Sequence, residues 1–136
     1  MRISLTLVKC GEVKRMTQKI VINACYGGFG VSIKAFERYL DLKGITYYKW
    51  KNSVDMNMLT TVPQNEYDEY NNDHFLSLYH IKRDDPVLIQ IIEEMGVEAD
   101  GHYAELKIIE IPDDVKWYIE DYDGMEHVAE VHRTWP

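Results

Sequence analysis

The chain is organised around the run Ile20-Val21-Ile22-Asn23-Ala24-Cys25-Tyr26-Gly27-Gly28-Phe29-Gly30-Val31-Ser32. A β-branched apolar strand enters a turn with three glycines, and Ser32 is typical of a residue that caps a following helix. Glycine lets another group approach the main chain closely, and N–H groups at a helix N-terminus favour anions. The order Gly-Gly-Phe-Gly matches neither the dinucleotide fingerprint nor the Walker A loop. Two interpretations therefore stay open: a tight strand-to-helix connection, which the local sequence favours, or a loop that cradles a phosphate.

The composition is typical of a soluble globular domain. The 136 residues are 46% hydrophobic and 28% charged, which suits a chain that buries a core. The longest apolar runs fall well short of about 18 residues, so no membrane-spanning segment is predicted. The N-terminus lacks the features of a secretory signal, and Cys10 and Cys25 are too few for a disulfide framework. We therefore expect a cytoplasmic protein.

The charge balance bears on the class of partner. The formal net charge is −8, from 23 acidic and 15 basic residues. Such an average field repels a polyanion, so DNA and RNA polymers are not expected as partners. A small anionic ligand is still compatible, because a pocket needs only local positive charge. Arginine is scarce, so each copy is a candidate for a specific role: Arg2, Arg15, Arg38, Arg83 and Arg133.

Two helices are predicted from their end signals. The first begins after the Ser32 cap, buries a stripe of apolar residues and ends before Gly44. The second has Asp85 at its N-cap and Pro86 at its first position, and it ends at Gly96. Strands are expected at residues 19–24, 45–51, 74–81 and 105–111, with a hairpin over 115–131. Residues 52–73 lack periodicity, which indicates a binding lid or a mobile loop.

This order of elements predicts an α+β fold, a mainly antiparallel sheet with two helices packed on one face. A single ligand-binding domain is expected over residues 16–136, with residues 1–15 as a dispensable N-terminal extension or an extra edge strand. In the C-terminal hairpin, a bulged turn with Gly124 left-handed would pair Asp121 with Met125. A two-residue turn would pair Asp121 with Glu126, so the bulged turn is favoured.

The sequence gives little support for catalysis or for a metal site. The five histidines show no His-x-x-x-His pair, and the cysteines form no Cys-x-x-Cys pair. No carboxylate pair stands in apolar surroundings that would raise one pKa for general-acid work. Ser32 and Cys25 lack the elbow motif of an activated nucleophile. We therefore expect no enzyme, no catalytic residues, no metal and no cofactor.

Aromatic residues and arginines favour a binding function instead. The chain contains 10 Tyr, 3 Trp and 3 Phe, and an aromatic ring stacked on a base contributes about 1–3 kcal/mol. Arginine binds phosphate through two parallel hydrogen bonds. Arg83 precedes the second helix and Arg133 lies in the C-terminal tail. For either arginine alone, a surface salt bridge is the alternative, and most of the aromatic rings are expected to pack in the core.

Five motifs are spread along the chain. They are Ile22-Asn23-Ala24-Cys25-Tyr26-Gly27-Gly28-Phe29-Gly30, Arg83-Asp84-Asp85-Pro86, Lys107-Ile108-Ile109-Glu110-Ile111-Pro112-Asp113-Asp114-Val115 with Trp117, Glu120-Asp121-Tyr122-Asp123-Gly124, and His132-Arg133-Thr134-Trp135. Together they resemble the Thoeris anti-defence sponges, small phage proteins that sequester cyclic ADP-ribose isomers made by bacterial TIR-domain enzymes. The resemblance covers residues 19–135, with 46–74 variable, and residues 1–15 have no counterpart in it.

The resemblance implies binding without turnover. In that family, homodimers, sometimes assembled into hexamers, enclose the signal in pockets lined by both protomers, and some members also hold cyclic oligonucleotides. Arginines hold the pyrophosphate and an aromatic ring stacks on adenine. On this chain, Arg83 and Arg133 match the phosphate contacts, and Phe29 or Tyr103 the stacking ring. The candidate ligand-binding residues are therefore Gly27, Gly28, Phe29, Gly30, Arg83, Tyr103 and Arg133.

The alternative function is inhibition of a host enzyme by protein–protein contact. The acidic C-terminal hairpin would carry it, with Asp121, Asp123 and Glu126 as an anionic surface. A nucleotide that co-purifies with the protein would favour the sponge, and a stoichiometric protein partner would favour the inhibitor.

Overall fold

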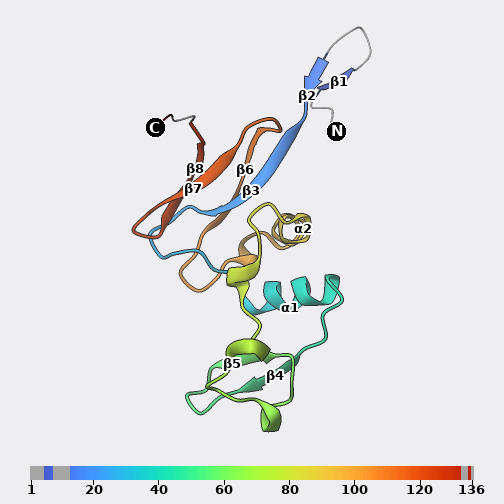
Figure 1. Cartoon of the computed structure of the whole chain (residues 1–136), viewed down its shortest axis with the longest axis vertical. Coiled ribbons are helices and arrows are strands. Elements are labelled where there is room, and N and C mark those ends of the chain that lie inside the picture. Colours follow the sequence, from blue (N-terminus) through green and yellow to red (C-terminus); the bar gives the residue numbers. More distant parts are fainter. Residues whose placement is uncertain (1–4, 8–12, 133–134, 136) are drawn as a thin grey trace.

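A computed structural model describes residues 5–7, 13–132 and 135 and has an α+β fold (Figure 1). Its strands are β1 (Leu5–Leu7), β2 (Val13–Arg15), β3 (Thr17–Asn23), β4 (Tyr48–Lys51), β5 (Asn57–Thr60), β6 (Leu106–Pro112), β7 (Trp117–Tyr122) and β8 (Met125–Glu130). Its helices are α1 (Ile33–Leu42) and α2 (Pro86–Met95). Short 3-10 turns lie at η2 (Gln64–Glu66), η3 (Asn72–His74), η4 (Leu78–His80) and η5 (Gly96–Ala99).

The strands of the described residues pair as four antiparallel ladders, β1–β2, β3–β6, β4–β5 and β7–β8. The central ladder is β3–β6, in which all seven residues of β3 have partners and Val21 lies opposite Ile108. β8 lies beside β3, α2 contacts β3, and α1 packs on α2. Along the long axis, the β3–β6 and β7–β8 ladders are followed by α2, then by α1 and finally by β4–β5 (Figure 1). The predicted α+β class, with antiparallel strands and two helices, is confirmed.

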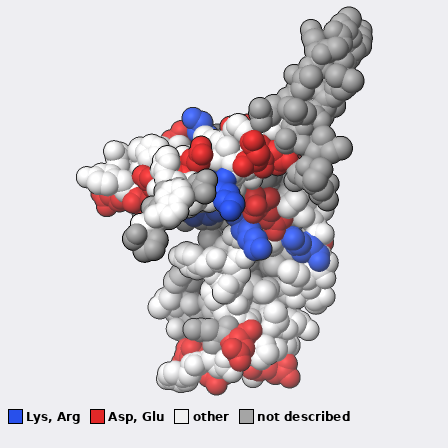
Figure 2. All heavy atoms as spheres, turned by 45° about the horizontal axis from the view of Figure 1, so that its top comes forward, with Lys and Arg blue, Asp and Glu red and all other residues white. Residues whose placement is uncertain are grey.

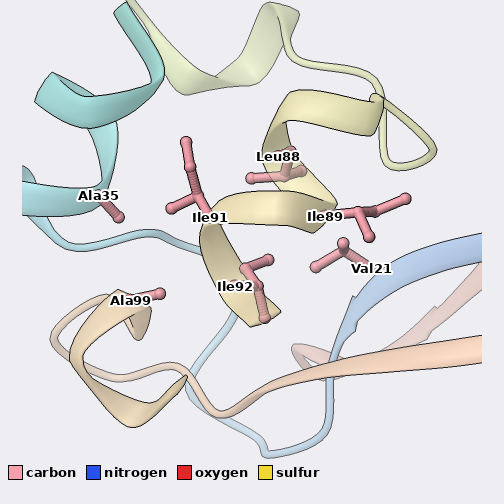
Figure 3. Close-up of a cluster of buried hydrophobic side chains, with 7 residues drawn as sticks. All are labelled: Val21, Ala35, Leu88, Ile89, Ile91, Ile92 and Ala99. Atoms are coloured by element: carbon pink, nitrogen blue, oxygen red, sulfur yellow. The ribbon is translucent and has the colours of Figure 1, made fainter. Parts of the chain in front are cut away.

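The core lies where α2 meets β3 and α1. Figure 3 shows the apolar side chains of α2 between Val21 of β3 and Ala35 of α1. Full burial of one such side chain stabilises the fold by about 1.5–3 kcal/mol. A second cluster of Phe36, Leu40 and Leu59 joins α1 to β5. The first cluster holds α2 against β3 and α1, and with it the segment just before this helix.

Both helices begin and end at the predicted residues. The Ser32 side chain accepts a hydrogen bond from the Ala35 N–H at 3.2 Å, and the left-handed Gly44 follows α1. Asp85 accepts from the Val87 N–H at 2.9 Å, Pro86 occupies the first helical position, and Gly96 has a positive φ at the C-terminal end of α2. The capping residues predict where a helix begins and ends because they pair the backbone N–H and C=O groups that the helix itself leaves unpaired.

The strand predicted at residues 74–81 is wrong. This segment begins with the last residue of η3 and contains all of η4, and the Ser77 side chain accepts from the Tyr79 N–H at 3.1 Å. β4 pairs with β5, which lies within residues 52–73, where the sequence indicates a binding lid or a mobile loop. A single bridge, Thr60 to Phe75, joins β5 to the misassigned segment.

The predicted register of the C-terminal hairpin is also wrong. Tyr122 pairs with Met125, and Asp121 lies opposite Glu126. Asp123 (φ 52°) and Gly124 (φ 92°) are both left-handed, as the two-residue type I′ turn requires. The two carboxylates can face each other because each has its own donor: Asp121 accepts from the Gly124 N–H at 2.8 Å, and Glu126 is bound by Arg83.

Candidate functional site

An arginine–carboxylate pair with a buried carboxylate and a partly buried arginine forms the centre of the candidate site. Arg83 donates from Nη1 to Glu126 Oε1 at 2.6 Å and from Nη2 to Oε2 at 2.9 Å, so the two groups meet side by side. The Glu126 side chain is only 5% exposed. Its burial favours a higher pKa, but the hydrogen bonds from Arg83 and from the Asn23 N–H outweigh burial and hold the pKa of Glu126 below 4.5. The pair is therefore fully charged at neutral pH.

Arg83 also connects the glycine turn to β3. Its guanidinium carbon lies 3.5 Å from the ring centroid of Phe29, a cation–π contact. Nη1 donates further to the Val21 carbonyl at 3.2 Å, and the Arg83 carbonyl accepts from the Val21 N–H at 2.8 Å. Two residues predicted to contact ligand, Phe29 and Arg83, are thus in contact with each other.

Asn23 holds together three segments that are distant in sequence. It is completely buried, and its amide nitrogen donates to the Cys25 and Gly124 carbonyls, each at 2.7 Å. Its amide oxygen accepts from the Glu105 N–H at 2.8 Å. Because a buried polar group without such partners is destabilising, this asparagine determines where the strand end, the hairpin turn and the start of β6 meet.

The glycine turn packs closely against the protein's own backbone. A Cβ on Gly27 would lie 1.8 Å from the Tyr103 carbonyl oxygen, and the Gly101 N–H donates to the Gly30 carbonyl at 2.9 Å. Gly28 differs, since it has φ +95° and open space where a Cβ would stand. These contacts support the interpretation as a tight strand-to-helix connection, with one open position at Gly28.

A groove of about 300 Å³ opens beside this junction, between the β3–β6 ladder and β8. Its walls include Ile22, Ile109, Met125 and Val128, and Lys107 and His127 bring positively charged or protonatable nitrogen to it. An apolar groove with cationic groups at hand suits a flat ring that carries an anionic group. Glu126 also lines the groove, so the buried ion pair is continuous with it.

The remaining predicted residues are placed as follows. Tyr103 contacts Gly27 and is 71% exposed, and the neighbouring His102 ring packs against it with centroids 4.2 Å apart. Arg133 lies outside the described residues. The interpretation of Glu126 as part of an anionic surface is wrong, because this side chain is buried against Arg83.

Asn23, Glu126 and Lys107 were not predicted as site residues. A signal for Asn23 is present in the sequence, since a lone amide within a β-branched strand must find buried partners. A signal for Glu126 is also present, because it occupies an inward position once the two-residue turn is assigned.

Comparison with protein-family models gives no match, and neither curated proteins nor solved structures give one. The resemblance to the sponge family therefore rests on its motifs. Among the described residues, no group of three or more His, Cys, Asp or Glu side chains could hold a metal ion. In the same part of the chain, no helix is both long and apolar enough to cross a membrane.

Proposed function

We propose that this protein binds a cyclic ADP-ribose-type signal and sequesters it without degrading it. The observation that carries the proposal is that motifs far apart in the sequence meet at one junction. Arg83 lies on Phe29, Asn23 donates to Gly124, and Ile22 pairs with Lys107. A groove with an apolar wall and a lysine opens beside this meeting point. The proposal includes a homo-oligomer in the host cytosol, as the resemblance implies.

The contacts suggest that some site residues hold the fold together and that others contact the ligand. Arginine has five N–H donors, and three of those of Arg83 already bind Val21 and Glu126. Arg83 therefore mainly holds the junction together, and Lys107 is the better candidate to meet a phosphate in the groove. The exposed ring of Tyr103, whose backbone lies against the glycine turn, is the candidate to stack on a base.

The ionisation of the site supports binding rather than turnover. A general acid at neutral pH needs a carboxyl group with a raised pKa. The pKa of Glu126 is shifted the opposite way, because the hydrogen bonds from Arg83 and Asn23 outweigh the effect of burial. This carboxylate stabilises Arg83 instead of transferring a proton.

Sequestration can be tested with the products of a TIR-domain enzyme. The protein is mixed with the reaction products, the mixture is filtered, and the retained protein is heat-denatured so that released ligand can be identified by mass spectrometry. We expect the signal to be retained and then released intact. Free signal in the filtrate at excess protein would contradict the proposal, and a cleaved ligand after denaturation would make the protein an enzyme.

Two variants test the site. Tyr103→Ala removes a stacking ring worth about 1–3 kcal/mol, so we expect binding to weaken roughly 5- to 150-fold. Lys107→Ala should weaken binding and reduce its dependence on salt. Tyr79→Ala is the matched control, because Tyr79 is also largely exposed (86%, against 71% for Tyr103) but lies on η4. Equal effects of Tyr103→Ala and Tyr79→Ala would remove Tyr103 from the site.

The second candidate function is inhibition of a host enzyme. The acidic hairpin surface that would serve it is smaller than predicted. Asp121, Tyr122 and Asp123 are exposed at the tip of the β7–β8 hairpin, whereas Glu126 is buried. An exposed tyrosine between two carboxylates suits a basic protein surface. A stoichiometric partner that Tyr122→Ala loses, together with no retained nucleotide, would favour this function over sequestration.

A further inference from the structure

A second pocket, of about 600 Å³, lies in the part of the molecule that carries β4 and β5. This part is at one end of the long axis, and α2 and α1 lie between it and β7–β8 (Figure 1). Trp50 of β4 and Met58 of β5 form part of its wall. Tyr67, Asp68 and Glu69, which follow η2, form another part. The proposed signal-binding function does not use this pocket.

The aromatic wall of the pocket is held in a defined position. The rings of Trp50 and Tyr67 meet edge to face, with centroids 5.3 Å apart and planes at 63°. The Trp50 indole N–H donates to the Thr60 hydroxyl at 2.9 Å, and Thr60 is fully buried and donates in turn to the Val62 carbonyl at 2.7 Å. A ring fixed in this way needs little further ordering on binding.

The charge around the pocket is negative. Residues 48–74 contain five carboxylates and two lysines, and Asp68 and Glu69 line the pocket itself. The two lysines are engaged elsewhere, Lys49 with Glu37 at 3.3 Å and Lys51 with Asp55 at 3.5 Å. Figure 2 shows acidic side chains at this end, while the basic side chains visible in that view lie nearer the middle. Such a pocket disfavours phosphate and favours a cation.

We propose that this pocket binds a small organic cation with an alkylated ammonium group. Aromatic faces attract such a cation through the ring quadrupole, and tryptophan does so most strongly. The carboxylates of Asp68 and Glu69 add long-range attraction. The Met58 thioether and the rings supply the apolar surface that the alkyl groups need. The charge preference is opposite to that of the groove at Lys107, so the two sites are chemically independent.

The test compares choline with 3,3-dimethylbutan-1-ol, a neutral molecule of the same shape. Each is titrated into the full-length protein labelled with ¹⁵N, and the Trp50 indole signal, assigned with a Trp50→Phe variant, is followed by NMR. We expect a saturable shift with choline and at least fivefold weaker binding of the neutral molecule. Adenosine monophosphate, an anionic probe, should leave the Trp50 signal in place.

A charge variant separates recognition from folding. Asp68 Oδ1 accepts from the Tyr70 N–H at 2.9 Å, and Asp68→Asn keeps this acceptor while it removes the charge. The double variant Asp68→Asn/Glu69→Gln should bind choline at least fivefold more weakly, with an unchanged melting temperature. Asp41→Asn on α1 is the control for removal of a carboxylate outside the pocket. It removes one negative charge, where the double variant removes two, and choline binding should be unchanged by it.

Three results would overturn the proposal. Equal affinity for choline and for its neutral counterpart would make the pocket merely apolar. Unchanged choline binding in the double variant would exclude the carboxylates as its recognition groups. A shift of Trp50 that grows linearly with choline, without saturation, would indicate a general salt effect in place of a site.

Discussion

At the residue scale, the Arg83–Glu126 pair dominates the site. Arg83→Met would leave Glu126 buried without its cation, which costs about 3–5 kcal/mol in the free energy of unfolding. Adding Glu126→Leu should recover much of this loss, because the buried carboxylate left without its cation is then absent. Urea denaturation measures each value. Arg38→Met is the control, since the Arg38–Glu94 pair is half-exposed and spans 3.4 Å; we expect it to cost no more than about 1 kcal/mol. Similar costs for Arg83→Met and Arg38→Met would contradict this account.

The same pair sets part of the pH dependence of stability. The pKa of Glu126 lies below 4.5 in the folded protein, because hydrogen bonds from Arg83 and Asn23 outweigh burial. A lowered pKa contributes stability that is present above about pH 4.5 and is lost as the pH falls through the folded-state value. The stability difference between the native chain and Glu126→Gln should therefore shrink between pH 5 and pH 3. A difference that stays constant over this interval would show that Glu126 does not titrate as expected.

At the element scale, the glycine turn can be tested position by position. Gly27→Ala would place a Cβ 1.8 Å from the Tyr103 carbonyl oxygen, and the forced shift of backbone should cost about 3 kcal/mol. Gly28→Ala meets open space but must hold φ at +95°, a strain of about 1–2 kcal/mol. Chemical denaturation should therefore rank Gly27→Ala as the more damaging. If Gly28→Ala reduces the free energy of signal binding by more than it reduces the free energy of unfolding, the open position contacts ligand.

Secondary structure was predictable where a residue pairs with, or ends, the backbone hydrogen bonding of a nearby turn of helix. Ser32 and Asp85 cap their helices, and Gly44 and Gly96 end them, because these needs are met within one turn of chain. Residues 74–81 were not predictable in this way. The segment is rich in apolar and aromatic residues, as a strand often is. Its Ser77 side chain nevertheless accepts from the Tyr79 N–H, and within the described part of the chain its one β-bridge is to Thr60. A ladder needs a partner strand, and no local pattern supplies that information.

The site was predictable only in part, for a related reason. Arg83 stood out by the scarcity of arginine, but its partner depended on the register of the hairpin. A register that separates Asp121 from Glu126 satisfies cross-strand electrostatics between those two residues alone. The observed register satisfies a third residue, Arg83, which lies 43 positions away from Glu126. Interactions at such separation are set by the packing of α2 on β3 and not by the hairpin sequence.

At the scale of the whole molecule, the net charge of −8 conceals two regions of opposite preference. The groove beside β8 contains Lys107 and His127, and the pocket of β4–β5 contains Asp68 and Glu69. Two helices and their core separate these regions along the long axis (Figure 1). Charges beyond about 8–10 Å are largely screened at physiological salt, so the acidic end need not weaken anion binding at the other. Anion and cation titrations should therefore be additive, with no change in one affinity when the other ligand is saturating.

The N-terminal hairpin gives the last prediction at this scale. β1 and β2 pair with each other, and they extend away from the β3–β6 and β7–β8 ladders (Figure 1). A chain that starts at Met16 keeps every β3–β6 pair and the bond from the Asp113 N–H to the Met16 carbonyl. We expect its free energy of unfolding to stay within about 0.5 kcal/mol of the full chain, with signal binding unchanged. A chain that starts at Ile20 is the comparison, since it also loses Gln18, which bonds to Trp117 and Val115. If denaturation shows the Met16 chain to be as unstable as the Ile20 chain, the hairpin belongs to the folded domain and is not dispensable.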